Sequence, residues 1–282
     1  MTTVTRFAPS PTGRLHLGHA YSALVASHAA GEAGGRFLLR MEDIDPGRCR
    51  DEFDAAILDD LAWLGLDWEQ PVRRQSEHMD EYRQALDRLQ AMGVLYPCFC
   101  TRREIQTEIA DAGHAPHGPD GPIYPGTCRS LDAAAQDRQT DAGKPFALRL
   151  NMARAIEAAG PLTWPDQDQG TINAAPEIFG DVVLARKETP TSYHLAVTVD
   201  DHLQGVTKVT RGEDLFAATH VHRLLQALLE LGVPDYHHHR LLTDDAGKRF
   251  AKRDKAATID DLRQAGKSPT EVRALAGWTE SP

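Results

Sequence analysis

The order of strand-like and helix-like segments in the first hundred residues predicts an α/β fold built on a doubly wound parallel sheet. Short apolar runs alternate there with longer stretches of helical spacing, and glycines and prolines separate them. Strands that alternate with helices pair in parallel, because each helix carries the chain back to the same end of the sheet. The composition, 41% hydrophobic and 26% charged over 282 residues, is that of a globular chain with ample core.

Each segment has a local signature. A strand runs from Val4 and stops at Pro9, and a second strand covers the apolar residues 36–41. Small residues favour a helix over 20–33, and apolar side chains at helical spacing predict another over 51–64. A further helix is expected over 76–92, with Ser76 as its N-cap and Gly93 at its end.

The middle of the chain interrupts this alternation and has the character of an insertion. Its first part is rich in glycine, proline and histidine, which predicts loop, and two short strands are expected further on. Regular helix returns as an amphipathic stretch that ends at Gly232, and the tail is expected to be helical and short. The ranges of these segments are 112–127 for the loop, 133–143 for a polar, alanine-rich stretch, 146–150 and 182–185 for the strands, 217–231 for the amphipathic helix and 259–278 for the tail.

Charge and cysteine content exclude several classes of protein. The formal net charge of −10 argues against broad, nonspecific binding to nucleic acid, although a local basic groove is compatible with it. The N-terminus lacks an apolar signal region and no apolar run is long enough to cross a bilayer, so we expect a cytoplasmic protein that contacts no membrane. Its four cysteines should then stay reduced, and the isolated Cys49 is interpreted as an incidental thiol.

The segment His16-Leu17-Gly18-His19 lies where a strand has ended and a helix is about to begin. A helix N-terminus carries partial positive charge and unpaired N–H groups, which suits phosphate, and two histidines add donors for a triphosphate. Gly18 lets a nucleotide approach the backbone closely. The alternative for these four residues alone is a loop with two surface histidines. The longer pattern Arg-Phe-Ala-Pro-Ser-Pro-Thr-Gly-x-Leu-His-x-Gly-His is far more specific.

That longer pattern, residues 6–19, resembles the signature of class I aminoacyl-tRNA synthetases in the form used by the glutamyl and glutaminyl branch. Residues 40–46 (RMEDIDP) and 209–215 (VTRGEDL) resemble two further blocks of the same branch, in the expected order. The resemblance implies a Rossmann-like catalytic domain, ATP as substrate together with Mg2+, and His16 and His19 as catalytic residues. With Gly18 they would bind ATP.

The same resemblance assigns a glutamate pocket. Arg6 and Arg211 would hold the side-chain carboxylate, because a guanidinium binds a carboxylate through two parallel hydrogen bonds. Glu42 would pair with the α-ammonium group, while Ser10 and Tyr193 would complete the pocket. The alternatives are surface salt bridges for Glu42 and an exposed loop charge for Arg211. A small-molecule adenylate-forming ligase that shares only the nucleotide motif is disfavoured by the blocks around Arg211 and Cys98.

A second ATP motif is expected late in the chain. The stretch Lys248-Arg249-Phe250-Ala251-Lys252-Arg253 matches the family's lysine-rich loop, with Lys252 as its second lysine and Arg249 at the first. Lys252 would be catalytic, because it can neutralise charge that develops on the α-phosphate and pyrophosphate, and Arg249 would bind ATP with it. Ala251 replaces the usual serine, a departure that bears on loop closure and rate. The alternative is a basic, solvated loop.

Three cysteines and a tyrosine form a candidate metal site. Cys98, Cys100 and Cys128 can supply three thiolates to a tetrahedral zinc ion, which needs one further ligand. By general rules His114 or His117 would be the ordinary fourth ligand. The glutamyl-queuosine branch of the family, which this stretch resembles, implies Tyr124 instead, in a single structural Zn2+ site. Three unrelated buried cysteines are the alternative. The run 237–239 (HHH) is a poor metal site, because adjacent side chains diverge.

The position of the lysine-rich loop bears on the substrate. Only about thirty residues follow it, so we expect no anticodon-binding domain. The resemblance to the glutamyl-queuosine branch implies activation of L-glutamate to glutamyl-adenylate without tRNA. Glutamate would then pass to the queuosine base in the anticodon loop of tRNA(Asp), whose anticodon arm the active-site face would grip, and we expect a monomer. The alternatives are a truncated glutamyl-tRNA synthetase that charges an acceptor end and a catalytically silent paralogue.

These expectations divide the chain into four parts. Residues 1–96 would form the first half of the catalytic domain and 97–185 an inserted α+β subdomain that binds zinc and contacts tRNA. Residues 186–240 would form the second half of the catalytic domain. Residues 241–282 would carry the ATP loop and a short helical extension.

Overall fold

Residues 4–74 have the predicted alternation of strands and helices. The computed structural model describes residues 2–111, 117–242 and 257–278. Three parallel strands lie in the order β1-β2-β3, and α1 and α2 connect them. These elements are β1 (Val4–Phe7), α1 (Leu17–Glu32), β2 (Arg36–Met41), α2 (Asp51–Trp63) and β3 (Glu69–Arg74).

A second sheet continues the first across a seam. It has the order β11-β12-β8-β9, with β11, β12 and β8 parallel and β9 antiparallel to β8. The members are β8 (Thr163–Asp166), β9 (Gly170–Asn173), β11 (Lys208–Gly212) and β12 (Asp235–His239). The backbone N–H of Thr207 donates to the carbonyl of Val4 (3.0 Å), which joins β1 to the start of β11. Ligands of such folds bind at the carboxyl ends of the strands on either side of the seam.

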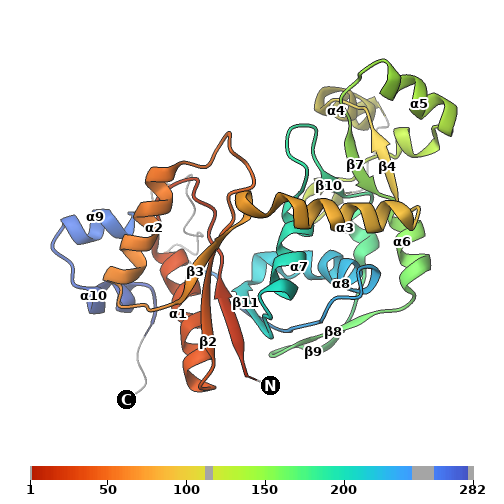
Figure 1. Ribbon diagram of the computed structural model, residues 1–282. Coiled ribbons are helices and arrows are strands. Elements are labelled where there is room, and N and C mark those ends of the chain that lie inside the picture. The colour runs from red at the N-terminus through yellow and green to blue at the C-terminus, as the bar shows by residue number, and fades with distance from the viewer. Residues whose placement is uncertain (1, 112–116, 243–256, 279–282) are drawn as a thin grey trace.

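Long helices join the two sheets to the rest of the molecule. The main core contains apolar side chains of α3 (Met79–Ala91), α6 (Met152–Ala159), α7 (Tyr193–Leu203) and α8 (Ala218–Leu228). Figure 1 shows α3 running from β3 toward the inserted subdomain. None of the helices in the described ranges is long and apolar enough to cross a bilayer.

The inserted subdomain is built on an antiparallel sheet in the order β10-β7-β4. Its strands are β4 (Leu95–Cys98), β7 (Ala147–Leu150) and β10 (Val183–Ala185), and its helices are α4 (Arg102–Asp111) and α5 (Ala133–Asp141). The predicted strands over 146–150 and 182–185 are therefore confirmed. Within the predicted loop, residues 117–118 (β5) and 121–122 (β6) pair as a short hairpin.

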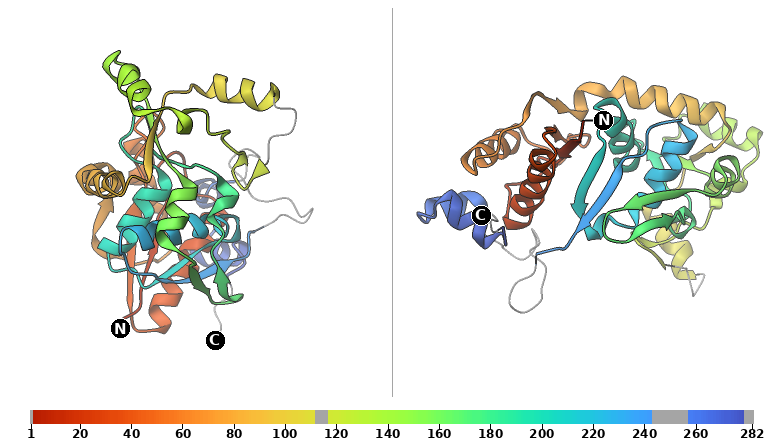
Figure 2. Two further views of the ribbon diagram at one scale, coloured as in Figure 1. Left: turned by 90° about the vertical axis from the view of Figure 1, so that its right-hand side faces the viewer. Right: turned by 90° about the horizontal axis from the view of Figure 1, so that it is seen from below.

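The C-terminal residues return to the first motif. The helices α9 (Ile259–Gln264) and α10 (Pro269–Leu275) confirm the helical tail, and their apolar faces pack on α1 and α2. Figures 1 and 2 show both helices beside α1, at the opposite end of the molecule from α4 and α5. The N–H of Ile259 donates to the carbonyl of Leu15 (2.9 Å), and Arg14 pairs with Asp260 (3.0 Å). The tail thus supports the loop that leads into α1.

Two details of the predicted elements are wrong. Ser76 is not the N-cap of α3. It lies inside a short 3₁₀ helix, η1 (Gln75–His78), where its N–H and hydroxyl both donate to Asp43, and His78 precedes α3 instead. The first helix begins at Leu17 rather than near Ala20, because the side chain of His16 caps it. The strand β3 was not expected, since Pro71 and its charged neighbours hide the pattern.

Candidate active site

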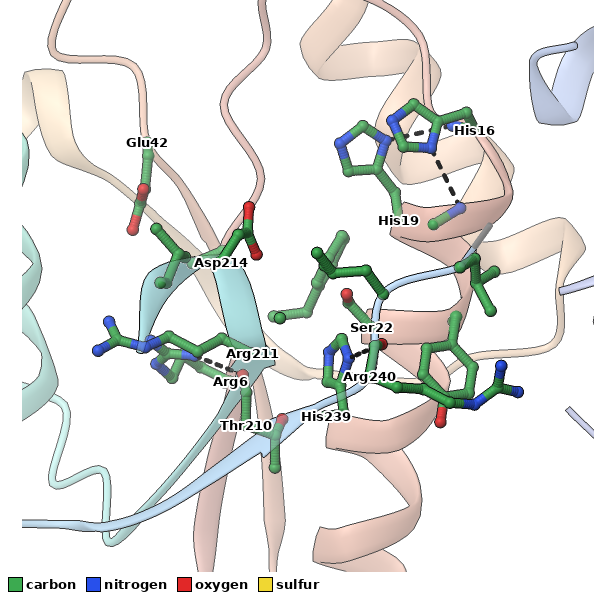
Figure 3. Close-up of a pocket in the computed structure, with 18 of the residues that line it drawn as sticks. Arg6, His16, His19, Ser22, Glu42, Thr210, Arg211, Asp214, His239 and Arg240 are labelled. Atoms are coloured by element: carbon green, nitrogen blue, oxygen red, sulfur yellow. Dashed lines mark hydrogen bonds between the residues drawn. The ribbon is translucent and has the colours of Figure 1, made fainter. Parts of the chain in front are cut away.

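A pocket of about 370 Å³ opens at the carboxyl ends of β1 and β11, where the two sheets adjoin. Seven of the eight predicted glutamate- and ATP-binding residues in the described ranges line it: Arg6, His16, Gly18, His19, Glu42, Tyr193 and Arg211. Figure 3 shows the pocket's two ends, with His16 and His19 at one end and Arg6, Arg211 and Glu42 at the other. The arrangement separates a basic, donor-rich end from an end that combines charges of both signs.

The two histidines occupy the N-terminus of α1 in a reciprocal cap. The N–H of Gly18 donates to Nδ1 of His16 (3.1 Å), and the N–H of His16 donates to Nδ1 of His19 (3.2 Å). Each neutral ring therefore carries its proton on Nε2, and the two ring centroids lie 3.8 Å apart. Two adjacent N–H donors above a helix N-terminus form a site suited to a phosphate chain.

Gly18 lies close to the ring of His16 and leaves little room for a side chain. A β-carbon at this position would lie 3.0 Å from Cε1 and 3.1 Å from Nδ1 of His16. A side chain there would therefore push the capping ring away. The small size of Gly18 therefore suits the His16 ring as well as the predicted approach of a nucleotide.

At the other end, Arg6 belongs to a buried network of charges. Its Nε lies 3.0 Å from Asp201, which also accepts from Arg40 at 2.9 Å. Burial alone would raise the pKa of Asp201, but the two guanidinium groups outweigh it and lower that pKa. Burial raises the pKa of Glu42 against the opposing effect of Arg40 and Arg6, so a further cation in the pocket would stabilise its carboxylate.

Arg211 is buried equally but has different neighbours. Its Nε lies 3.2 Å from Nε2 of His238, one terminal nitrogen lies 3.2 Å from Nδ1 of His222, and the other donates to the hydroxyl of Thr219 at 2.6 Å. Among the residues that the structure describes, no carboxylate forms an ion pair with it. Burial raises the pKa of the neighbouring Tyr193 to about 12, so its hydroxyl keeps its proton at neutral pH.

A family model for the catalytic domain of class I tRNA synthetases of the E and Q types matches residues 2–280. The chain belongs to this family. It is 52% identical over 279 residues to a glutamyl-Q tRNA(Asp) synthetase of Rhodobacter capsulatus, covering 97% of this chain and 99% of that one. A protein of the same name in Nocardia farcinica is 45% identical, with 96% and 82% covered.

A solved structure of this synthetase family supports the fold. The glutamate tRNA ligase of Elizabethkingia meningosepticum, crystallised with its amino acid, superposes with a TM-score of 0.82 at 26% identity. The match covers 98% of this chain and 60% of that ligase. The class I α/β fold with a parallel sheet is thereby confirmed, and the chain is a synthetase-type ligase.

The predicted metal ligands also lie together, next to the antiparallel sheet that contains β4. The sulfurs of Cys98, Cys100 and Cys128 all lie within 4.8 Å of one another. The hydroxyl of Tyr124 lies 3.5 Å from Sγ of Cys98 and 3.7 Å from Sγ of Cys100. Three thiols at this spacing could hold a metal ion, and the phenol lies close enough to supply a fourth donor.

Several residues fall outside these groups. Ser10 is exposed, does not line the pocket and has its hydroxyl 4.0 Å from the Cys49 sulfur. Arg249, Lys252 and Ala251 of the ATP loop, and His114, lie outside the described residues. The HHH run diverges as expected, since His237 faces Asp168 at the surface while His238 is buried.

The structure adds residues that sequence reasoning missed. Thr210 and His239 line the pocket, and within the described ranges the Thr210 hydroxyl and Nε2 of His239 are buried without a hydrogen-bond partner. Asp214 lies between the two ends of the pocket in Figure 3. Thr210 and Asp214 lie close to Arg211 in the block 209–215, and this proximity in the sequence could have identified them as pocket residues. His239 could have been found only from the register of β12.

Proposed function

We propose that this synthetase uses ATP to activate L-glutamate without tRNA and transfers it to the queuosine base in the anticodon loop of tRNA(Asp). One observation carries the first part: a single pocket joins two imidazole N–H donors at a helix N-terminus to a buried guanidinium, Arg211, that no described carboxylate neutralises. The relatives named glutamyl-Q tRNA(Asp) synthetase support the second part.

The activation step is a displacement at phosphorus. An oxygen of the glutamate α-carboxylate attacks the α-phosphorus of ATP, the bond to the bridging oxygen of the β-phosphate breaks, and pyrophosphate leaves with that electron pair. His16 and His19 donate N–H groups to the phosphates, where negative charge develops. Arg211 and Arg6 hold the side-chain carboxylate while Glu42 pairs with the α-ammonium, so the enzyme contributes chiefly position and charge. Mg2+ bound with ATP supplies further charge neutralisation.

The transfer step needs room for an acceptor. A second cavity of about 450 Å³ shares Tyr193, Asp214 and Leu215 with the first and reaches the inserted subdomain. An acceptor nucleoside bound in this cavity would bring its hydroxyl toward the carbonyl carbon of glutamyl-adenylate. Attack there forms the ester, releases AMP and passes the hydroxyl proton to solvent. The Ser192 hydroxyl, buried and unpartnered within the described ranges, lines the same cavity.

Pyrophosphate exchange tests the activation step. Exchange into ATP is measured with each of the twenty amino acids, with and without tRNA, and we expect glutamate alone to support it in both conditions. Labelled glutamate is then offered with tRNA(Asp) containing queuosine, tRNA(Asp) lacking it, and tRNA(Glu). Only the first should be labelled. Labelling of tRNA(Glu) would favour an acceptor-end synthetase, and absence of exchange would favour a silent paralogue.

We also propose one structural zinc ion per chain, bound by Cys98, Cys100, Tyr124 and Cys128. We further propose that the protein is a monomer and that it works in the cytoplasm, where its tRNA is found. The wild type should contain one equivalent of zinc by elemental analysis and elute as a monomer. Cys98→Ser should lose the metal and unfold at lower temperature, whereas the matched variant Cys49→Ser should keep both. A metal-free wild type of full stability would refute the zinc site.

A further inference from the structure

The environment of Arg211 differs from that of the other buried arginines in the described part of the chain. Arg6 and Arg40 each lie within 3.0 Å of a carboxylate oxygen of Asp201. The three nitrogens of Arg211 instead meet two imidazoles and a hydroxyl, at 2.6–3.2 Å. Its charge is therefore held in place by neutral acceptors and is not cancelled by them.

The acceptor role of His238 depends on Asp166. Nδ1 of His238 lies 2.7 Å from Oδ2 of Asp166, and the side chains of both residues are 1% exposed. The other carboxylate oxygen accepts the backbone N–H groups of Asp168 and Gln169, each at 3.0 Å. An ionised carboxylate can only accept, so the imidazole proton lies on Nδ1. The lone pair of Nε2 is thereby directed at the Nε–H of Arg211.

A second pair of side chains, His222 and His194, orients Arg211 in a similar way. Nδ1 of His222 must accept from Arg211, so its proton lies on Nε2, 3.2 Å from Nδ1 of His194. Thr219 contacts both Arg211 and His238, since its hydroxyl accepts from Arg211 and lies 3.2 Å from Nε2 of His238. Three side chains, His238, His222 and Thr219, therefore hold the guanidinium in one orientation.

We propose that His238, fixed in one tautomer by Asp166, is a positioning residue that presents the uncancelled charge of Arg211 to the substrate's side-chain carboxylate and so makes the enzyme select glutamate over glutamine. The inference rests on the proposed function. A carboxylate beside Arg211 would offset its charge, and a neutral amide would then bind nearly as well. With neutral acceptors, an anionic side chain gains the full attraction, whereas an amide nitrogen brings donors toward donors.

The decisive variant is Asp166→Asn, examined by pyrophosphate exchange. The asparagine amide can donate to Nδ1 of His238, which moves the imidazole proton to Nε2 and turns the acceptor facing Arg211 into a donor. The KM for glutamate should rise about 10- to 100-fold, the magnitude of a hydrogen bond to a charged group. The KM for ATP and kcat should stay within about 3-fold, and the preference for glutamate over glutamine in kcat/KM should fall.

The chain supplies its own control. His237 and Asp168 form a similar pair, 3.5 Å apart, that faces the surface beside the buried one. The Asp168→Asn variant should leave kcat and the KM values for glutamate and ATP unchanged. An Asp166→Asn protein that melts like the wild type and keeps its glutamate KM within 2-fold would overturn the proposal, as would equal rises in the KM values for glutamate and ATP.

A second pair of variants decides the matter if Asp166→Asn does not fold. His238→Gln retains an acceptor near the position of Nε2, and His238→Leu has none. The proposal requires the KM for glutamate to be at least about 5-fold lower in His238→Gln than in His238→Leu. This ratio is the effect of one hydrogen bond of about 1 kcal/mol. Equal KM values would refute it. A wild type that shows no glutamate-dependent exchange refutes the proposed function itself, a separate outcome.

Discussion

Arg6 and Arg211 line the same end of one pocket and are buried to the same degree, 4% and 5% exposed, yet their surroundings differ in kind. Arg6 shares Asp201 with the fully buried Arg40, which also lies near Asp200 and Glu42. Arg211 contacts histidines and a threonine. The guanidinium of Arg6 is paired with a carboxylate inside the protein. The guanidinium of Arg211 has no described carboxylate beside it and can bind one from a ligand.

The two arginines show that a paired charge network and a binding site can lie next to each other in one pocket wall. A buried, paired charge adds little net stability, but loss of its partner is strongly destabilising. A buried cation with neutral acceptors keeps its charge available to a ligand, so its value appears in binding. Mutation of Arg40, in the paired network, should therefore act mainly on stability, and mutation of Arg211 mainly on activity.

The largest change among these predictions is a loss of unfolding free energy in the variant Arg40→Met. Burial alone would lower the pKa of Arg40, but Asp201, Asp200 and Glu42 outweigh it and raise that pKa, so the acids depend on this cation. Its removal should lower the free energy of unfolding by about 3–5 kcal/mol in urea titrations. As a control, Arg36→Ala breaks an exposed pair with Glu69 and should cost less than about 1 kcal/mol. Equal losses of unfolding free energy in Arg40→Met and Arg36→Ala would contradict the structural role given to the buried network.

The next largest effect separates the two arginines by activity. Arg211→Met keeps much of the bulk and removes the charge meant for the substrate. The kcat/KM for glutamate should fall about 30- to 1000-fold in pyrophosphate exchange, equivalent to about 2–4 kcal/mol. The loss of unfolding free energy should be less than half of that in Arg40→Met. A variant as unstable as Arg40→Met with unaltered glutamate kinetics would reverse the assignment.

A smaller effect should appear in the dependence of stability on pH. Burial, followed by Arg211, lowers the pKa of His238 to about 4, and burial and Arg211 lower that of His194 to about 4 as well. Unfolded histidine titrates near 6.5, so between these values the unfolded chain binds more protons. The neutral histidines thus contribute stability that is complete above pH 6.5 and is lost as the pH falls toward 4.

Comparison with His238→Gln isolates this contribution. Glu42, whose pKa burial raises, acts with the opposite sign but is common to both proteins, so it cancels in the difference. Unfolding free energies of the two proteins at several values between pH 4 and 7 should diverge as the pH rises, by about 1–2 kcal/mol in total. Parallel curves would show that His238 is not held neutral.

Local sequence patterns were enough for much of the fold and the site. The strands β1 and β2 and the helices α2 and α8 follow from apolar spacing, and six of the seven predicted residues that line the pocket lie in three short blocks with a family resemblance. The strand β3 was missed because its pattern is polar, and α3 begins later than expected because Ser76 binds Asp43 instead of capping a helix.

Local sequence alone predicted the alternation of strands and helices at the start of the chain, the motif residues and the grouping of three cysteines with Tyr124. Each of these follows from local spacing or from a block that resembles a family. Only the tertiary structure decided which charges cancel. Asp201 meets Arg6 across 195 residues of sequence, and Asp166 meets His238 across 72. Periodicity shows which face of a strand is buried, but the partner it meets there depends on how the two sheets adjoin.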